Sequence, residues 1–178
     1  SNFVRDQRPF PHDVAAGHPL APHTVAQLRD MAAAGIEIGA HTRTHSDLGS
    51  IRDPQTMRDE IVGGGEDLED WLGQRVRYFA FPYGLHANLN RLAFCTAREV
   101  GYEAACSAYG AYNFPGGDGF HIQRAHGDPD MLRLRNWVSL DPRKLRMEPF
   151  VDTTPDEATR AALRELTLDR ELEAAGAR

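Results

Sequence analysis

Two histidines, His41 and His45, lie four residues apart directly behind the alternating apolar run "IEIGA". Imidazole is a common zinc ligand, and a turn of helix at a strand end would place both rings on one side, about a metal's width apart. In parallel α/β folds the carboxyl ends of the strands carry the active site. The pair therefore predicts a metal site, and two solvated histidines in a polar loop are the alternative. A catalytic site usually takes three protein ligands, so a carboxylate is missing from this pair.

A second group of candidate residues ends another strand-like run, "RYFAFPYG", which spans residues 77–84. A Pro-Tyr-Gly turn at a strand end exposes backbone N–H groups and an aromatic face, and such N–H groups can hold an oxyanion. In the alternative interpretation Arg77 is a surface charge, and Phe79, Phe81 and Tyr83 are core aromatics. Taken alone, this stretch favours the structural interpretation.

The elements that must position these residues alternate between helical and strand-like patterns. Helices are expected at about residues 25–35, 54–73, 89–101, 129–137 and from 154 onward, and strands at about 36–40, 76–81, 102–112 and 120–126. Such alternation indicates an α/β fold with a parallel sheet or barrel. We expect one domain over residues 1–150 and an amphipathic helix, packed on it or extending from it, over residues 151–178.

Local signals mark where two of these helices begin and where one is interrupted. Asp53 and Pro54 fit the N-cap and first turn of one helix, and "TPDE", which starts at Thr154, fits a capping box. Three consecutive glycines at residues 63–65 cost the helix that contains them about 2–3 kcal/mol relative to alanine. We therefore expect close packing or a kink at the glycines.

Composition and charge exclude several classes of protein. The net charge is −6 over 178 residues and the basic residues are scattered, so nucleic acid is not an expected partner. No segment approaches the run of about 18 apolar residues needed to span a bilayer. Cys95 and Cys106 are too few for a disulfide framework or a four-cysteine zinc site and are expected to be free thiols. The opening residues lack a secretory signal pattern, which leaves the compartment open and favours a cytoplasmic over a periplasmic location.

Together, "GIEIGAHTRTHSDL" and the following "RYFAFPYG" resemble the polysaccharide deacetylase family, the NodB-homology carbohydrate esterases. The family's histidine motif, H-[ST]-x-x-H or a close variant, is matched by His41 to His45. Its arginine motif is matched by Arg77 with Pro82 and Tyr83. The order, spacing and strand context of the two motifs make the resemblance specific, and it extends over most of the chain.

The resemblance implies a distorted (β/α) barrel, usually with fewer than eight strands, and a divalent metal, usually zinc, at its C-terminal mouth. His41, His45 and an aspartate would bind that metal, which polarises an amide carbonyl and activates a water for a carboxylate base. The implied substrate is an N-acetylated glycan in bacterial carbohydrate metabolism. By the same resemblance the Tyr83 N–H holds the oxyanion, Pro82 and Tyr83 contact substrate, and Arg77 orients the base.

The family's leaving-group acid is a histidine late in the chain, where the local match is poor. His126, which ends the strand-like run "FHIQRAH", is the expected acid, and His121 in the same segment is its rival. A histidine in such a place is more often only a polar neighbour, which is the alternative interpretation.

One family motif has no counterpart in these residues. The motif T-F-D-D-G on the first strand supplies both the base and the aspartate ligand, and neither "GGDGF" at 116–120 nor "FVDTT" at 150–154 replaces it. We therefore expect the chain to start inside the domain, with the first strand and helix, its missing partner segment, upstream. The alternative is a non-catalytic carbohydrate-binding or regulatory module with the same fold. A metal-stabilised structural domain is a third reading, and it needs a fourth protein ligand.

Overall fold

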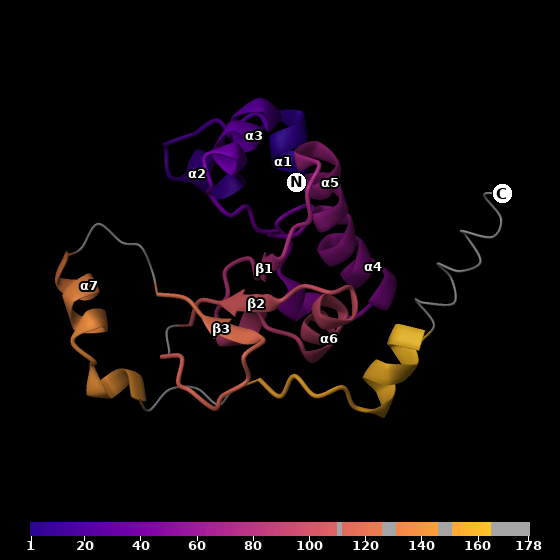
Figure 1. Cartoon of the computed structure of the whole chain (residues 1–178), viewed down its shortest axis with the longest axis vertical. Helices are drawn as coiled ribbons and strands as arrows, with labels where there is room; N and C mark the ends of the chain where they lie inside the picture. The colour runs from indigo at the N-terminus through magenta and orange to yellow at the C-terminus, as the bar shows by residue number, and fades with distance from the viewer. Residues whose placement is uncertain (110–111, 126–130, 146–150, 165–178) are drawn as a thin grey trace.

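The structure is a computed structural model that describes residues 1–109, 112–125, 131–145 and 151–164. Three short strands lie in the middle, with helices around them (Figure 1). The strands are β1 (Tyr78–Ala80), β2 (Ala104–Ser107) and β3 (His121–Gln123). The α-helices are α1 (Asn2–Asp6), α2 (Pro11–Ala15), α3 (Val25–Ala33), α4 (Pro54–Arg58), α5 (Gly64–Leu72), α6 (Arg91–Glu99) and α7 (Met131–Val138). A π-helical segment, η2 (Asp59–Gly63), joins α4 to α5, and short 3-10 turns are η1 (Leu48–Ser50), η3 (His86–Asn88) and η4 (Pro142–Leu145).

The strands form one parallel sheet in the order β1, β2, β3, with Phe79 opposite Ala105 and Cys106 opposite Ile122. Parallel neighbours need a crossover connection, and α6 supplies it between β1 and β2 (Figure 1). The carboxyl ends of all three strands therefore meet at one edge of the sheet. This confirms the predicted α/β class, and the small sheet is consistent with part of a distorted barrel.

The predicted strand at residues 36–40 is reduced to a single bridge. Ala40 N–H donates to Tyr78 O, and Ala80 N–H donates to Ala40 O, both at 2.8 Å. The preceding residues form no ladder, and Ile36 is 50% exposed. Within the described residues the segment lies beside β1, and the pairing with β1 is limited to Ala40. The other three predicted strands are present but shorter.

The core lies between one face of the sheet and the helices α4 to α6. Phe79 and Phe81 alternate on that face and are 1% and 0% exposed. The Phe81 ring centroid lies 4.6 Å from that of Phe94 on α6. Cys95 on α6 is buried and Cys106 on β2 is half-buried, and both are free thiols, as predicted.

The chain from α4 through η2 to α5 is one continuous helical rod with a change of helix type at its centre (Figure 1). Asp53 caps its start by accepting the Thr56 N–H at 2.8 Å, as predicted. The π-helical turn directly precedes the glycines, and a Cβ at Gly64 would lie only 2.7 Å from the Thr42 carbonyl carbon. Both expectations for the glycines, a distortion and close packing, are therefore confirmed.

The C-terminal helix begins later than its capping-box pattern predicts. Residues 157–164 are helical, and Asp156 caps them by accepting the Thr159 N–H at 2.8 Å. Thr154 is not the cap, because the helix begins three residues after it; the Thr154 N–H donates to the Asp152 carboxylate at 2.9 Å. Arg91 on α6 holds Asp152 and Asp156 at 3.0 and 2.6 Å, which ties this segment to the domain. The predicted division at residues 150 and 151 stays a prediction.

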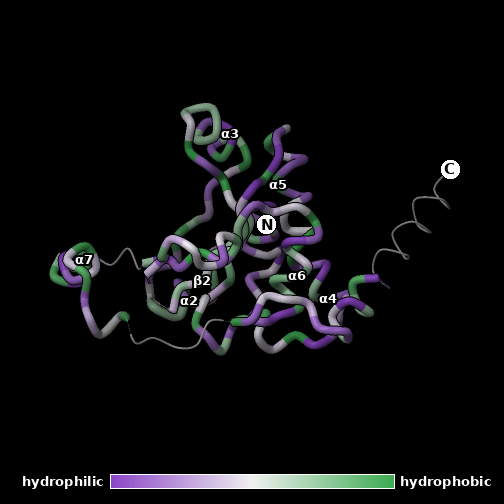
Figure 2. The backbone as a smooth tube through the Cα atoms, turned by 60° about the horizontal axis from the view of Figure 1, so that its bottom comes forward, coloured by the Kyte–Doolittle hydropathy of each residue, from purple (hydrophilic) through white to green (hydrophobic). Residues whose placement is uncertain are grey.

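Helix α7 stands apart from the sheet in both overall views (Figures 1 and 2), and Figure 2 shows hydrophobic and hydrophilic residues mixed along it. Its Met131 and Val138 are 71% and 78% exposed. The Tyr112 hydroxyl donates to Trp137 O at 3.0 Å and connects α7 to the preceding loop. The predicted start of this helix, residue 129, lies outside the described residues. In the described part of the chain, no helix combines the length and the apolarity that a membrane crossing needs.

Candidate functional site

His41 directly follows the bridge residue Ala40 and lies at the carboxyl edge of the sheet. Its Nδ1 lies 2.7 Å from Ala80 O, which makes Nδ1 the donor and leaves the Nε2 lone pair for another partner. Burial lowers the pKa of His41 from 6.5 to about 4, against the opposite effect of the bond to Ala80. The imidazole is therefore neutral near pH 7, which is the form that binds a metal.

His45 reaches His41 through an irregular loop, not through the helical turn that the spacing predicts. Thr42 and His45 have φ angles of 64° and 63°, in the left-handed region, and the Thr42 hydroxyl accepts the His45 N–H at 2.9 Å. The two imidazole centroids lie 5.0 Å apart at an interplanar angle of 70°. The predicted proximity of the rings is correct, although the backbone achieves it in another way. Burial lowers the pKa of His45 as well.

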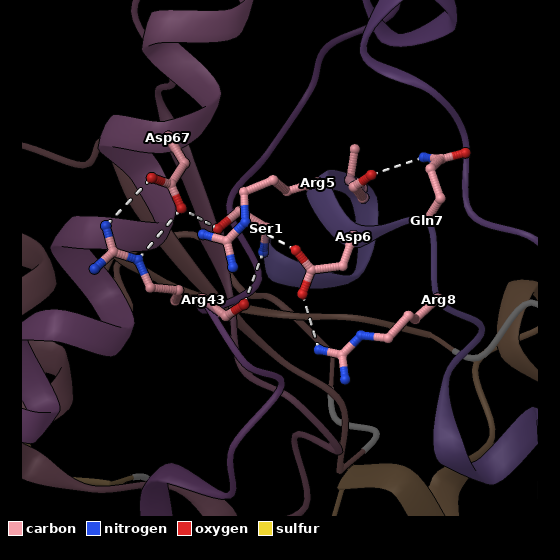
Figure 3. A network of polar contacts seen from close by, with 8 residues as sticks. Ser1, Arg5, Asp6, Gln7, Arg8, Arg43 and Asp67 are labelled. Atoms are coloured by element: carbon pink, nitrogen blue, oxygen red, sulfur yellow. Dashed lines mark hydrogen bonds and ion pairs between the residues drawn. The ribbon is translucent and has the colours of Figure 1, made fainter.

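An ion pair with α5 fixes the back of the histidine loop, residues 41–47 (Figure 3). Arg43 donates from Nε and Nη2 to the Asp67 carboxylate at 3.2 Å each. The Ser1 hydroxyl donates to the same carboxylate, and Ser1 N donates to Thr42 O at 2.9 Å. Asn2 N–H donates to Arg43 O at 2.9 Å. The loop is therefore held between α5 and the start of α1.

The turn after β1 faces the histidines, as the strand-end position predicts. Tyr83 has a φ of 60°, is 53% exposed, and its ring centroid lies 5.1 Å from that of His45. Within the described residues the Tyr83 N–H donates no hydrogen bond. Gly84 is required in this turn, because its φ is 69° and a Cβ would lie 2.7 Å from Ala108 N. Pro82 is fully buried, so this placement does not support its predicted contact with substrate.

Helix α2 adds an aromatic wall to the site that the sequence reasoning missed. The ring centroids of Phe10 and His12 lie 5.3 and 5.8 Å from that of His45. His12 Nε2 is also 3.3 Å from the Asp13 carboxylate. His12 stands in a segment that resembles a solvated loop by its prolines, and no local pattern in the sequence connects it to residue 45.

A second residue that the sequence reasoning missed is Arg124, directly after β3. Its Nη2 donates to Phe81 O at 3.0 Å, and its Nε donates to Ser107 O at 3.1 Å. Burial lowers the pKa of this guanidinium, and its charge lowers the pKa of His41. No carboxylate contacts Arg124 in the described part of the chain. Its position at a strand's carboxyl end is the signal that marks it, as for His41.

Arg77, the arginine that the resemblance selects, lies elsewhere. It precedes β1, at the amino edge of the sheet, whereas His41 bonds to Ala80 at the carboxyl edge. Its Nη2 is 2.7 Å from Glu37 and its Nη1 is 3.7 Å from Glu103. These exposed ion pairs give Arg77 surface partners, and its predicted catalytic role stays a prediction.

Of the two candidates for the leaving-group acid, one lies among the described residues and the other does not. His126 lies outside the described residues, so its role stays a prediction. His121, the rival, is the first residue of β3 and is 3% exposed, with its Nε2 2.8 Å from the Ser107 hydroxyl. Such burial gives His121 little access to substrate.

The fit of these residues to a metal is partial. His41 and His45 bring two neutral imidazoles together, which is half of a tetrahedral zinc site. Among the described residues, no group of three or more histidine, cysteine or acidic side chains is arranged to hold a metal. A metal held by this pair would therefore need a third ligand from outside those residues.

Comparisons with known proteins match the part of the sequence that contains the histidine loop and the turn after β1. A family model described as "Polysaccharide deacetylase" matches residues 13–105, just over half of the chain, which includes both motifs. A curated relative, the gellan lyase of Bacillus sp., is 41% identical over 56 residues, which are 32% of this chain and 2% of that protein.

Solved structures share the fold. The deacetylase PplD of Streptococcus pyogenes, in complex with acetate, has a TM-score of 0.60 and 19% identity, covering 72% of this chain and 55% of that chain. A de-N-acetylase from Aggregatibacter actinomycetemcomitans has a TM-score of 0.55 and 17% identity, covering 66% and 53%. The polysaccharide deacetylase BC0361 of Bacillus cereus has a TM-score of 0.50 and 22% identity, covering 59% and 32%. The chain thus spans 2% to 55% of the length of these four relatives.

Proposed function

Because the chain belongs to the polysaccharide deacetylase family, we propose that it forms part of a metal-dependent hydrolase that removes N-acetyl groups from an amino-sugar-containing glycan. The observation that carries the proposal is the pair of imidazoles at the carboxyl edge of the sheet, 5.0 Å apart and beside Tyr83. Acetate is the product of this reaction, and it is the molecule bound to the related PplD.

His41 and His45 would hold the metal, most simply zinc, because neutral imidazoles are common zinc ligands. The bond from His41 Nδ1 to Ala80 O supports this assignment, since it orients the ring and leaves Nε2 for the metal. A carboxylate from outside the described residues would complete the ligand set, and a second one would act as the base. When bound, the metal polarises the amide carbonyl and lowers the pKa of water.

Tyr83 supplies two contacts to the glycan in this proposal. Its N–H, which has no hydrogen-bond acceptor among the described residues, can stabilise an oxygen that gains negative charge. Its half-exposed ring gives a flat apolar surface with a polar end, which suits a sugar. Phe10 and His12, whose rings also lie beside His45, would add a further aromatic surface.

Arg124 is the better placed arginine for orienting the base carboxylate. Its Nε and Nη2 are anchored on Ser107 O and Phe81 O, close to His41, and its Nη1 has no carboxylate partner among the described residues. A planar guanidinium holds a carboxylate in one orientation, which is what a base requires. Arg77 stays the alternative, and the two arginines can be compared directly by substitution.

The leaving amine needs a proton, and the proposal assigns this role to His126. The burial of His121 beside Ser107 makes it the weaker candidate. Histidine is the side chain that most commonly acts as a general acid in enzymes.

A non-catalytic glycan-binding module is the second candidate function. The observation that favours it is that the described residues contain no group of three metal ligands. Such a module would bind an N-acetylated oligosaccharide at Tyr83 and Phe10 without releasing acetate.

Acetate release from N-acetylated chito-oligosaccharides, with and without zinc, separates the two functions. A deacetylase releases acetate in a zinc-dependent way, and the His41→Ala/His45→Ala double variant loses both the activity and the bound zinc. Metal analysis of the double variant is the readout independent of turnover. Equal zinc content in both proteins would overturn the ligand assignment. Glycan binding without acetate release would favour the module.

A further inference from the structure

Glu60 is a buried carboxylate beside the candidate site that the proposed chemistry does not use. It lies in the π-helical segment η2 and is 7% exposed. A buried carboxylate is costly to a fold unless its oxygens accept hydrogen bonds. The hydrogen-bond donors that contact the Glu60 carboxylate therefore identify the part of the fold that Glu60 stabilises.

The Glu60 side chain binds the histidine loop. Its carboxylate accepts the Thr44 N–H at 3.0 Å, the Thr44 hydroxyl at 2.6 Å and the Ser46 hydroxyl at 3.4 Å. Its backbone carbonyl accepts the Arg43 N–H at 3.0 Å. Thr44 and Ser46 are the two residues that flank His45. Glu60 therefore holds the backbone on both sides of this histidine.

The loop needs such an anchor because of its backbone conformation. Thr42 and His45 both have positive φ angles, which residues with a side chain rarely adopt. A conformation of this kind persists only where the surroundings determine it. The bond between Thr42 and His45 lies within the loop, whereas the bonds to Glu60 fix the loop to a helix of the core.

The π-helical turn brings the helix close enough for these contacts. Gly64, one turn beyond Glu60, packs against the Thr42 backbone so tightly that a Cβ there would clash at 2.7 Å. A π-turn inserts one residue into the helix and turns the following side chains, and such turns are frequent at functional sites. Glu60 and Gly64 therefore both contact the histidine loop from the same continuous helical rod.

We propose that Glu60 is a positioning residue for the metal site: by binding Thr44 and Ser46 it holds the His45 imidazole where it shares one metal with His41. This inference rests on the proposed metal-dependent function. Glu60 is neither a ligand nor the base, because the loop's own donors engage both of its oxygens and cover it.

Amide hydrogen exchange in the metal-free protein tests the anchor without any need for activity. In Glu60→Gln the side chain can present its NH₂ group, which is a donor, to the Thr44 N–H, and this leaves the Thr44 N–H without an acceptor. Hydrogen exchange at the Thr44 and His45 amides should therefore accelerate by about tenfold or more. Asp59→Asn is the matched control, because it removes the same charge from the neighbouring, exposed position in η2. It should leave the exchange at both amides unchanged.

Zinc affinity, measured by competition with a chromophoric chelator at a temperature where every variant is folded, tests the effect on the site. Glu60→Gln should weaken zinc binding by about 10- to 100-fold, and Asp59→Asn should not. Thr44→Val removes one of the anchoring donors from an exposed residue, and it should weaken zinc binding in the same direction if Glu60→Gln fails to fold. If Glu60→Gln and Thr44→Val both bind zinc with the wild-type affinity and exchange their amide hydrogens at the wild-type rate, the proposal is wrong.

The outcome also separates this inference from the proposed function. If the wild-type protein binds no zinc at His41 and His45, the proposed function fails, and the positioning role fails with it. If the wild-type protein binds zinc and Glu60→Gln binds it equally well, only the positioning role is wrong.

Discussion

Acid should destabilise the metal-free protein through His41 in particular. Its pKa is 6.5 when solvated and about 4 in the folded protein, where burial disfavours the charged form. Between these values the unfolded chain binds a proton that the folded chain does not, so stability falls as the pH falls. Integrated from pH 7.5 to 5.0, this difference amounts to about 2 kcal/mol of unfolding free energy from this one group.

Urea denaturation of the metal-free protein at pH 7.5 and 5.0 measures this loss, and His41→Asn is the matched control. Asparagine cannot titrate, and its amide can keep a donor near the Nδ1 position that binds Ala80 O. Other titrating groups contribute to both proteins, so the difference between the two pH dependences isolates His41. The wild type should lose about 2 kcal/mol more than the variant. An equal loss in both would show that the imidazole is solvated, and the site geometry would be wrong.

Two further predictions concern the arginines and the helical rod. Arg124→Lys should lower acetate release by about tenfold or more with little change in melting temperature, because lysine keeps the charge but loses the planar fork, and Arg77→Lys should leave the rate unchanged. A loss of acetate release in Arg77→Lys, with an unchanged rate in Arg124→Lys, would instead favour Arg77 as the arginine that orients the base. Gly64→Ala should lower the unfolding free energy measured in urea by about 1–3 kcal/mol, since its Cβ would lie 2.7 Å from the Thr42 carbonyl carbon. Gly119→Ala, where nothing lies within 4 Å, should change it little, and equal effects would contradict the close packing.

The histidine pair and the turn after β1 could be placed from the sequence because both depend on local signals. All strands of a parallel sheet have their carboxyl ends at the same edge, which is where active sites lie. A residue that directly follows an apolar, strand-like run is therefore expected at that edge from its position in the sequence alone. The sequence therefore predicts that His41 and Tyr83 lie at the same edge of the sheet. In the structure the His45 ring lies beside the rings of both residues. The glycines at 63–65 were informative for a similar reason, since their cost to a helix requires a compensating contact.

The backbone of the histidine loop could not be predicted from the i,i+4 spacing. The spacing fits a helical turn, but the observed loop depends on Glu60, which lies 15 residues after His45 and reaches it through a π-helical turn. The strand predicted at 36–40 is reduced to the bridge at Ala40, because an alternating pattern indicates a strand but does not determine how many of its residues pair with the neighbouring strand.

The two candidate arginines show where a motif and a structure differ. The sequence contains Arg77 close to the turn, which matches the family's order of residues, but a residue at the start of a strand lies at the opposite edge from one at its end. Arg124 reaches the same edge as His41 from a strand that is more than 40 residues further along. The walls contributed by Phe10 and His12 are likewise a result of tertiary packing that no local pattern reports.

Acetate release by the natural protein that contains these residues is the most direct test of a metal-dependent deacetylase. N-acetylated chito-oligosaccharide would be supplied with zinc, with a chelator, and to the His41→Ala/His45→Ala variant, with folding checked by circular dichroism. We expect acetate release that zinc supports, that the chelator abolishes, and that falls by about 100-fold or more in the folded double variant. Acetate release at the same rate in the chelator, or by the double variant, would contradict the assignment of the two histidines to a catalytic metal.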